Sequence, residues 1–247
     1  MDRFIYVAMT GASESLRMQA TNGHNLANAS TTGFRADLAL FQARQVVGGG
    51  FESRAYATAV GAGWNPQVGA VQSSGRPLDV AVDGSGWIAV QARDGREAYT
   101  RAGDLRVNAD GLLTSGAGHP VLGDGGPIIL PTYSSIGIGV DGSVSIVPQG
   151  QGPETVAQVA RIRLVDPPAA DLVKGDDGLF RMRDGSEAPA SAGVRLVPGS
   201  LETSNVNVAD ALVTMIELGR RFEFAVKAMR TAEENGAAAS QLLRVQS

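Results

Sequence analysis

The clearest periodic pattern lies in residues 198–247, where apolar side chains recur at alternating intervals of four and three residues. This spacing is typical of one face of a helix that packs lengthwise against another helix. The face comprises Val208, Leu212, Met215, Gly219, Phe222, Val226 and Met229. Asn205 and Asn207 precede it, and the side chain of either can cap the first turn. The pattern therefore predicts a long amphipathic helix in this segment.

Residues 1–36 show the same alternating interval near the other end of the chain. The apolar positions are Ile5, Met9, Ala12, Leu16 and Ala20. Gly23, Asn25 and Asn28 weaken the pattern, and Thr31-Thr32-Gly33 is a stop signal for a helix. A second amphipathic helix is therefore predicted in this segment.

Residues 76–197 carry short apolar runs separated by tight-turn signals. The pair Asp-Gly occurs seven times in this stretch, and it is a strong signal for a hairpin turn. Residues 159–165 alternate between apolar and polar positions, as a strand with one buried face does. All 11 prolines lie between Pro66 and Pro198, so the residues that break helices are confined to the middle of the chain. We therefore predict an α+β fold, with helices at both ends and a central antiparallel domain that resembles a β barrel or sandwich.

Residues 37–75 are the hardest segment to assign. They contain Gly48-Gly49-Gly50 and Gly61-Ala62-Gly63, and they have few large apolar residues to anchor a core. Such a composition is typical of turns and loops. We expect this segment to be an extended, irregular connector.

The two predicted helices pose a packing problem, because their apolar faces lie outside the β domain. Burying one large apolar side chain contributes about 1.5–3 kcal/mol to stability. Two thin helices with Ala, Ser and Gly in their faces cannot shield both faces from water by packing on each other alone. We therefore expect the apolar faces to meet other subunits.

Composition excludes several classes of function. The chain has 247 residues, a net charge of −4 and no Cys, and its two histidines are His24 and His119. Thiol nucleophiles, disulfide scaffolds and Cys-ligated zinc are therefore excluded. The cationic residues are scattered and form no basic stripe, which argues against nucleic acid as a partner. No apolar run approaches the roughly 18 residues of a membrane span, and residues 4–9 are too short an apolar stretch for a secretory signal.

The sequence carries no convincing catalytic pattern. Residues 137–142 match G-x-G-x-x-G, but strand-like residues follow them where a dinucleotide site needs a helix, so a hairpin turn is the better interpretation. Neither histidine has a recognisable partner for nucleophilic catalysis. We expect a protein that is not an enzyme and that holds no cofactor or metal.

Two motifs resemble the signatures of a known family. Residues 25–35 read Asn-Leu-Ala-Asn-Ala-Ser-Thr-Thr-Gly-Phe-Arg, and residues 201–207 read Leu-Glu-Thr-Ser-Asn-Val-Asn. They closely resemble the N-terminal and C-terminal signatures of the bacterial flagellar rod and hook proteins. Three further stretches, residues 76–82, 87–91 and 99–101, are similar to the central domain of that family.

The resemblance implies a structural subunit of the flagellar basal-body rod. In that family the terminal helices pair into a coiled-coil-like layer around an axial tube, the β domain lies outside it, and the helical assembly transmits torque across the periplasm. Arg220-Arg221-Phe222-Glu223 favours the proximal rod, with the distal-rod protein FlgG or another axial protein of the family as the alternative. The implied partners are further copies of the chain, the rod proteins FlgB, FlgC and FlgG, and the flagellar type III apparatus, which exports such subunits without a cleavable signal peptide.

The expected contacts between subunits involve both ends of the chain. They comprise Ile5, Met9, Leu16, Asn25, Leu26, Asn28, Thr31, Gly33, Phe34, Asn205, Val208, Leu212, Met215, Phe222, Val226 and Met229. For the polar members Asn25, Asn28, Thr31 and Asn205, two interpretations stay open. Their side chains either cap helix ends or bridge subunits and so fix the register, or they form local turns within one chain.

A different class of function is a β-rich module that binds glycans such as peptidoglycan. It predicts an exposed aromatic platform, for which the central domain offers Trp87, Tyr99, Tyr133 and Phe180. Trp87 lies in an apolar run, so we expect it to be buried. A cell-wall hydrolase is a further possibility, against which the missing nucleophile and base argue.

Overall fold

The computed structural model describes residues 3–45, 55–152 and 154–245. The chain divides into two compact units, each assembled from segments that are distant in sequence. The helical unit comprises residues 1–29, 37–64 and 206–247, and the β unit comprises residues 30–36 and 65–205. The backbone therefore passes from one unit to the other four times. The boundary between residues 36 and 37 is also one of the predicted divisions, whereas the predicted divisions after residues 75 and 197 are not boundaries between these units.

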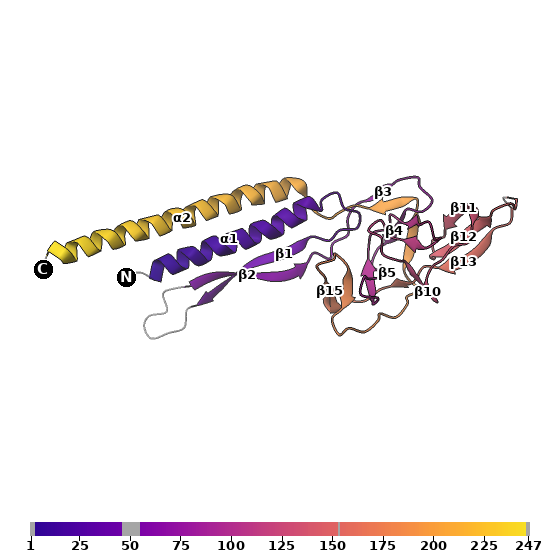
Figure 1. The fold of residues 1–247 in the computed structure, drawn as a ribbon, viewed down its shortest axis with the longest axis horizontal. Helices are drawn as coiled ribbons and strands as arrows, with labels where there is room; N and C mark the ends of the chain where they lie inside the picture. Colours follow the sequence, from indigo (N-terminus) through magenta and orange to yellow (C-terminus); the bar gives the residue numbers. More distant parts are fainter. Residues whose placement is uncertain (1–2, 46–54, 153, 246–247) are drawn as a thin grey trace. The chain divides into compact units, whose positions relative to one another are not determined.

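The helical unit contains the two predicted helices, α1 (Arg3–Ala27) and α2 (Val208–Val245). They lie side by side (Figure 1), and Asn22 near the end of α1 donates a hydrogen bond of 2.7 Å to the carbonyl oxygen of Ala211 near the start of α2. The helices are therefore antiparallel. Asn207 caps α2, because its Oδ1 accepts a hydrogen bond from the backbone N–H of Ala209 at 3.0 Å. In the described parts of the chain, no helix combines the length and the apolarity needed to cross a membrane.

The buried positions of these helices carry mostly small side chains. They include Ala8, Ala12 and Ser15 on α1, and Ala211, Leu218 and Ala232 on α2. The positions on α2 are separated by multiples of seven residues, the repeat of a helix that packs along a neighbour. Small side chains let helix backbones approach closely, so the unit packs without burying most of the large residues of the predicted faces.

A β-hairpin completes the helical unit. Strands β1 (Asp37–Gln45) and β2 (Ala55–Trp64) pair antiparallel and lie along α1 (Figure 1). The prediction of an irregular connector over residues 37–75 is therefore wrong for both strands. β2 contains mostly Ala and Gly, and a strand so poor in large apolar side chains gives no strong alternating pattern in its sequence. Gly48-Gly49-Gly50 lies outside the described residues.

The β unit is built from short strands and one short 3-10 helix. Their bounds are β3 Val71–Ser73, β4 Val80–Asp83, β5 Trp87–Gln91, β6 Glu97–Thr100, β7 Arg106–Val107, β8 Leu113–Thr114, β9 Leu122–Gly123, β10 Gly126–Pro127, β11 Tyr133–Ile138, β12 Ser143–Pro148, β13 Ala157–Arg161, β14 Leu164–Val165, the 3-10 helix Ala169–Asp171, β15 Leu172–Lys174, β16 Phe180–Met182, β17 Arg195–Pro198 and β18 Ser200–Glu202.

These strands pair antiparallel in several small sheets. The largest has the order β14-β5-β6-β16-β15, and a second has the order β11-β12-β13. The pairs β17-β4, β18-β3, β9-β10 and β7-β8 form the rest. The α+β class is therefore confirmed. No closed barrel forms among the described strands, so the predicted barrel or sandwich form is not confirmed.

Glycine makes the tight turns between these strands. In six of the seven Asp-Gly pairs the glycine has a positive φ, a conformation that side chains with a Cβ rarely adopt. These are Gly84, Gly95, Gly111, Gly142, Gly178 and Gly185. The turn predicted at residues 137–142 is confirmed, because it joins β11 to β12 and the Gly142 N–H donates to the Gly139 carbonyl at 3.0 Å.

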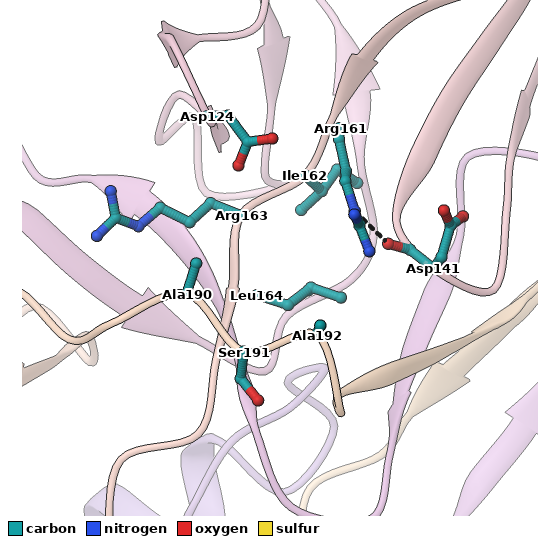
Figure 2. A pocket seen from close by; sticks show the side chains of 9 residues that line it. All are labelled: Asp124, Asp141, Arg161, Ile162, Arg163, Leu164, Ala190, Ser191 and Ala192. Atoms are coloured by element: carbon teal, nitrogen blue, oxygen red, sulfur yellow. Dashed lines mark hydrogen bonds between the residues drawn. The ribbon is translucent and has the colours of Figure 1, made fainter.

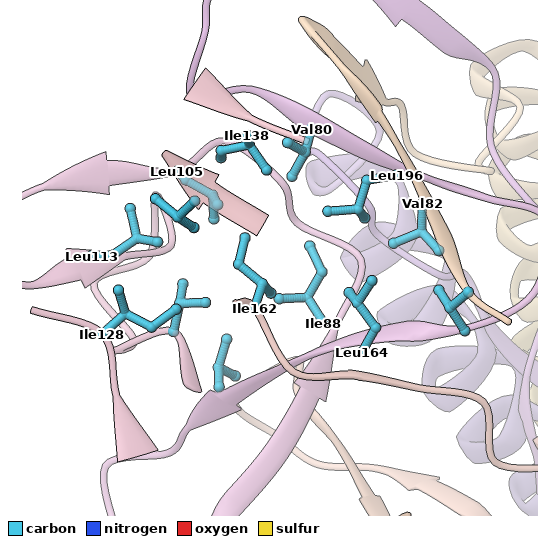
Figure 3. Close-up of a cluster of buried hydrophobic side chains, with 14 of the residues drawn as sticks. Val80, Val82, Ile88, Leu105, Leu113, Ile128, Ile138, Ile162, Leu164 and Leu196 are labelled. Carbon is cyan, nitrogen blue, oxygen red and sulfur yellow. The ribbon is translucent and has the colours of Figure 1, made fainter. Parts of the chain in front are cut away.

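One apolar core holds the β unit together. Figure 3 shows side chains from several sheets converging in it, including Ile88 of β5, Leu196 of β17 and Ile162 before β14. All three are almost fully buried. Because strands from distant parts of the sequence contribute to the same core, the unit depends on its complete set of segments.

Ile88→Ala is expected to lower the free energy of unfolding by about 2–5 kcal/mol, because it leaves a cavity in this core. Urea unfolding of the full chain, followed by circular dichroism, measures the change. Ile129→Ala is the matched control, since Ile129 is 66% exposed and Ile88 is 0% exposed. Equal losses for the two variants would contradict the position of the core.

Candidate functional site

The two signature segments of the sequence meet inside the β unit. The Gly33 N–H donates a hydrogen bond of 2.8 Å to the carbonyl oxygen of Glu202 in β18. The Asn205 N–H donates to the carbonyl oxygen of Phe34 at 3.3 Å. Gly33 has a φ of 65°, and a Cβ there would overlap the backbone of Arg101. Glycine is therefore required for the N-terminal segment to lie this close to its neighbours.

A buried ionic cluster joins the same two segments. The carboxylate of Glu202 lies 2.6 Å from Nη1 of Arg35 and 3.0 Å from Nη1 of Arg101. Its Oε1 also accepts a hydrogen bond from the Gly69 N–H at 2.8 Å. The side chains of Glu202 and Arg35 are each 1% exposed, and that of Arg101 is 4% exposed. An ion pair of this kind is costly to break from one side only, because the remaining charge stays buried without its partner.

Arg101 has further partners that hold its guanidinium in place. Its Nη2 donates to the Gly84 carbonyl at 2.6 Å, and its Nη1 donates to the Val82 carbonyl at 3.2 Å. Burial lowers the pKa of the Arg101 guanidinium, the Glu202 carboxylate opposes this effect, and the charge of Arg35 adds to it. The cluster therefore contains two cations around one anion, and Glu202 is the group that makes their burial tolerable.

Aromatic rings surround this cluster. The guanidinium carbons of Arg35 and Arg101 lie 5.9 Å and 5.4 Å from the ring centre of Trp87, within range of a cation–π interaction. Trp87 in turn packs against Phe180, with ring centres 4.4 Å apart and ring planes tilted by 43°. The segment is also anchored from β15, where Lys174 donates from Nζ to the Arg35 carbonyl at 2.7 Å.

Asn205 binds backbone groups of two other segments. Its Oδ1 accepts a hydrogen bond from the Ala36 N–H at 2.8 Å, and its Nδ2 donates to the carbonyls of Asn65 at 3.1 Å and Gln67 at 2.8 Å. The Asn65 N–H completes the arrangement by donating to the Ala36 carbonyl at 2.8 Å. One amide therefore organises three segments of the β unit.

In the helical unit, Asn25 holds the start of β1 in a similar way. Its Oδ1 accepts from the Asp37 N–H, and its Nδ2 donates to the Asp37 carbonyl, both at 2.8 Å. His24 adds a contact of 2.8 Å between its Nδ1 and Oδ2 of Asp37. Asn28 closes the end of α1, because its Nδ2 donates to the His24 carbonyl at 2.9 Å. These contacts lie within one chain, as in the second of the two interpretations given for Asn25, Asn28 and Asn205. A role of these residues in contacts between subunits stays a prediction.

The predicted apolar contact residues are unequally exposed in the single chain. Ile5, Met9, Leu16, Val208 and Leu212 are exposed. Leu26, Met215, Phe222, Val226 and Met229 are half-buried. The exposed side chains are available to a neighbouring subunit, whereas the half-buried ones are partly shielded within the helical unit.

A second apolar stripe on α2 was not predicted. Val213, Ile216 and Phe224 are exposed, and the side chain of Phe224 is 71% exposed. The spacing of three between the first two positions is helical, but the stripe is interrupted by Arg220, so the dominant pattern beginning at Val208 masks it. A helix with apolar side chains on more than one face is typical of one that is surrounded by other elements.

A small cleft in the β unit offers no catalytic chemistry. Figure 2 shows it between Arg161, Arg163 and Ser191, with a volume of about 140 Å³. Typical ligand pockets have roughly 300–1,000 Å³. Arg161 donates from Nε to the Asp141 carbonyl at 3.0 Å, and Arg163 donates from Nη2 to the Ala188 carbonyl at 3.0 Å. Both arginines are therefore engaged in holding the backbone, and neither His nor Lys lines the cleft beside Ser191.

Three family models match successive parts of the chain. Residues 5–35 match the family described as flagella basal body rod protein. Residues 81–146 match the D1 domain of the flagellar hook proteins FlgE, FlgF and FlgG, and residues 197–242 match the C-terminal region of the same group of basal-body rod proteins. Both signature segments fall largely within these matches.

Known proteins are similar to the chain over nearly its full length. The flagellar basal-body rod protein FlgF of Salmonella typhimurium is 43% identical, with 98% of this chain and 99% of the relative covered. FlgF of Escherichia coli is 42% identical over the same shares. The flagellar basal-body rod protein FlgG of Bacillus subtilis is 31% identical, with 95% of this chain and 96% of the relative covered.

Glu202→Gln is expected to lower the free energy of unfolding by about 3–5 kcal/mol, because it leaves Arg35 and Arg101 buried without a counter-charge. Urea unfolding of the full chain measures the loss. Glu187→Gln is the control, because the side chain of Glu187 is 66% exposed and lies 3.8 Å from Arg163, so its loss should be below about 1 kcal/mol. A Glu202→Gln variant as stable as this control would contradict the central role of the cluster.

Proposed function

This chain belongs to the flagellar basal-body rod protein family, and we propose that it is a FlgF-type structural subunit of the proximal rod. It is a structural protein and not an enzyme. Its identity to FlgF of Salmonella typhimurium and of Escherichia coli is 42–43%, against 31% to FlgG of Bacillus subtilis, which supports the proximal over the distal position.

The observation that supports assembly most directly is the exposed apolar surface of the helical unit. Met9 and Leu16 on α1, and Leu212, Ile216 and Phe224 on α2, are all exposed in the single chain. Large apolar side chains grouped in this way mark an interaction surface. Covering each of them contributes up to about 1.5–3 kcal/mol, so a neighbouring subunit gains stability by packing against these faces.

The partners we propose are further copies of this chain and the rod proteins FlgB, FlgC and FlgG. Exposed apolar side chains on both α1 and α2 allow each subunit to contact more than one neighbour. Contacts between unlike surfaces do not close on themselves, so they build a helical stack of the kind that a rod requires. We further propose that the subunit reaches the periplasmic rod through the flagellar type III export apparatus.

The glycan-binding alternative finds little support in the β unit. Trp87, Tyr99 and Phe180 are buried, and Tyr133 is half-buried. Their rings therefore form no exposed platform on which a sugar can stack. The aromatic residues of this unit serve its packing.

Phe224→Asp is expected to abolish rod assembly and motility, because it places a charge in an apolar contact between subunits. Swimming and flagella counts are measured in the source bacterium after its own copy of the gene is replaced. The purified variant should unfold at the same urea concentration as the wild type, because Phe224 is mostly exposed in the single chain.

Thr231→Asp is the matched control, since it adds the same charge at an exposed polar position of α2. It should assemble and swim normally. Normal motility of the Phe224→Asp strain would show that this face is not a contact between subunits.

A further inference from the structure

The two units of the chain are covalently joined at four places. The backbone leaves one unit for the other between residues 29 and 30, 36 and 37, 64 and 65, and 205 and 206. In a rod subunit, these four backbone connections are the covalent links through which torque applied to one unit reaches the other. The stiffness of each connection therefore matters for the function proposed above.

The connection between Ala36 and Asp37 is held on its β-unit side by Asn205. The Ala36 N–H donates to Oδ1 of Asn205 at 2.8 Å, and the Ala36 carbonyl accepts from the Asn65 N–H at 2.8 Å. Asn205 also fixes Asn65 itself, by donating from Nδ2 to its carbonyl at 3.1 Å. Ala36, Asn65 and Asn205 are the β-unit residues that flank three of the four connections, so a single amide ties these three backbones together.

The same connection is held on its helical-unit side by Asn25. The Asp37 N–H donates to Oδ1 of Asn25, and the Asp37 carbonyl accepts from Nδ2 of Asn25, both at 2.8 Å. All four backbone polar groups of Ala36 and Asp37 are therefore hydrogen-bonded. Rotation about ψ of Ala36 moves its carbonyl away from the Asn65 N–H, and rotation about φ of Asp37 moves its N–H away from Asn25, so each rotation requires breaking a hydrogen bond.

We propose that Asn25 and Asn205 are paired clamps that make the Ala36–Asp37 connection a stiff link between the two units. Asn25 acts from α1 in the helical unit, and Asn205 acts from the segment after β18 in the β unit. Each is a positioning residue that fixes backbone and needs no contact with a neighbouring subunit. The inference rests on the proposed function, because a stiff link has its use in a subunit that bears torque.

The test measures how freely the units move in the purified full chain. The chain has no Cys, so cysteines introduced at the exposed positions Thr231 in α2 and Asp184 in the β unit can be spin-labelled selectively. Pulsed electron spin resonance then gives the distribution of distances between the labels. We expect Asn25→Ala and Asn205→Ala each to widen this distribution, by about twofold in the double variant.

Hydrogen exchange of the same proteins locates the effect. The Ala36 amide should exchange about tenfold faster in Asn205→Ala, and the Asp37 amide about tenfold faster in Asn25→Ala, since each loses its acceptor. Asn22→Ala and Asn108→Ala are matched controls. Asn22 bonds to the Ala211 carbonyl within the helical unit, and Asn108 accepts from the Asp110 and Leu112 N–H groups within the β unit. Both controls should leave the distance distribution unchanged.

A distribution that stays narrow in the double variant would overturn the proposal, and so would equal broadening in the two controls. If an alanine variant fails to fold, the aspartate variant at the same position replaces it in the test. Aspartate keeps the side-chain oxygen that accepts a hydrogen bond and lacks the amide N–H that donates one. Restoration of flagella by the wild-type gene in a deletion strain tests the proposed function separately. If the wild-type gene does not restore flagella, the proposed function is refuted and the measured stiffness of the link is unaffected. If the strain is motile but the link is flexible, only the proposed role of Asn25 and Asn205 is refuted.

Discussion

The β unit depends on one buried carboxylate, that of Glu202, which lies between the guanidinium groups of Arg35 and Arg101. These three residues come from near the start, the middle and near the end of the chain. Charged groups so completely buried are tolerated only where each has a partner at short distance. The arrangement therefore requires that residues 30–36 and β18 (Ser200–Glu202) meet, and this meeting brings together the segment that follows α1 and the segment that precedes α2.

In the helical unit, small and large apolar side chains differ in where they lie. Small residues such as Ala12 and Ala211 are buried within the unit, whereas larger ones such as Leu16 and Phe224 are exposed. Close packing of small side chains holds the elements of the unit together, and the large apolar area that contributes most to association is left outside. The exposed large side chains are available to the contacts between subunits that we propose. Such a distribution of side chains suits a protein that works only as part of a larger structure.

Several features could be predicted from the sequence because they depend on neighbouring residues. Both helices follow from apolar spacing, the cap at Asn207 from its residue type, and the turn at residues 137–142 from its glycines. The hairpin β1-β2 could not be predicted in this way, since β2 contains mostly small residues and shows no strong alternation of large apolar and polar positions. The exposed stripe that includes Phe224 was also missed, because the dominant periodicity of α2 describes a different face.

By itself, the sequence determined the α+β class, the two helices, the tight turns and the family to which the chain belongs. The first three are encoded locally, in the periodicity of side chains and in the backbone freedom of glycine, whereas the family followed from the resemblance of residues 25–35 and 201–207 to known signatures. Only the tertiary structure decided that Arg35 pairs with Glu202, that Asn205 binds Ala36 and Asn65, and that most of the buried positions on the helices carry small residues. Each of these depends on contacts between residues far apart in the chain. A local pattern does not indicate which distant residue a buried charge or amide will contact, because the packing of the whole unit determines that pairing.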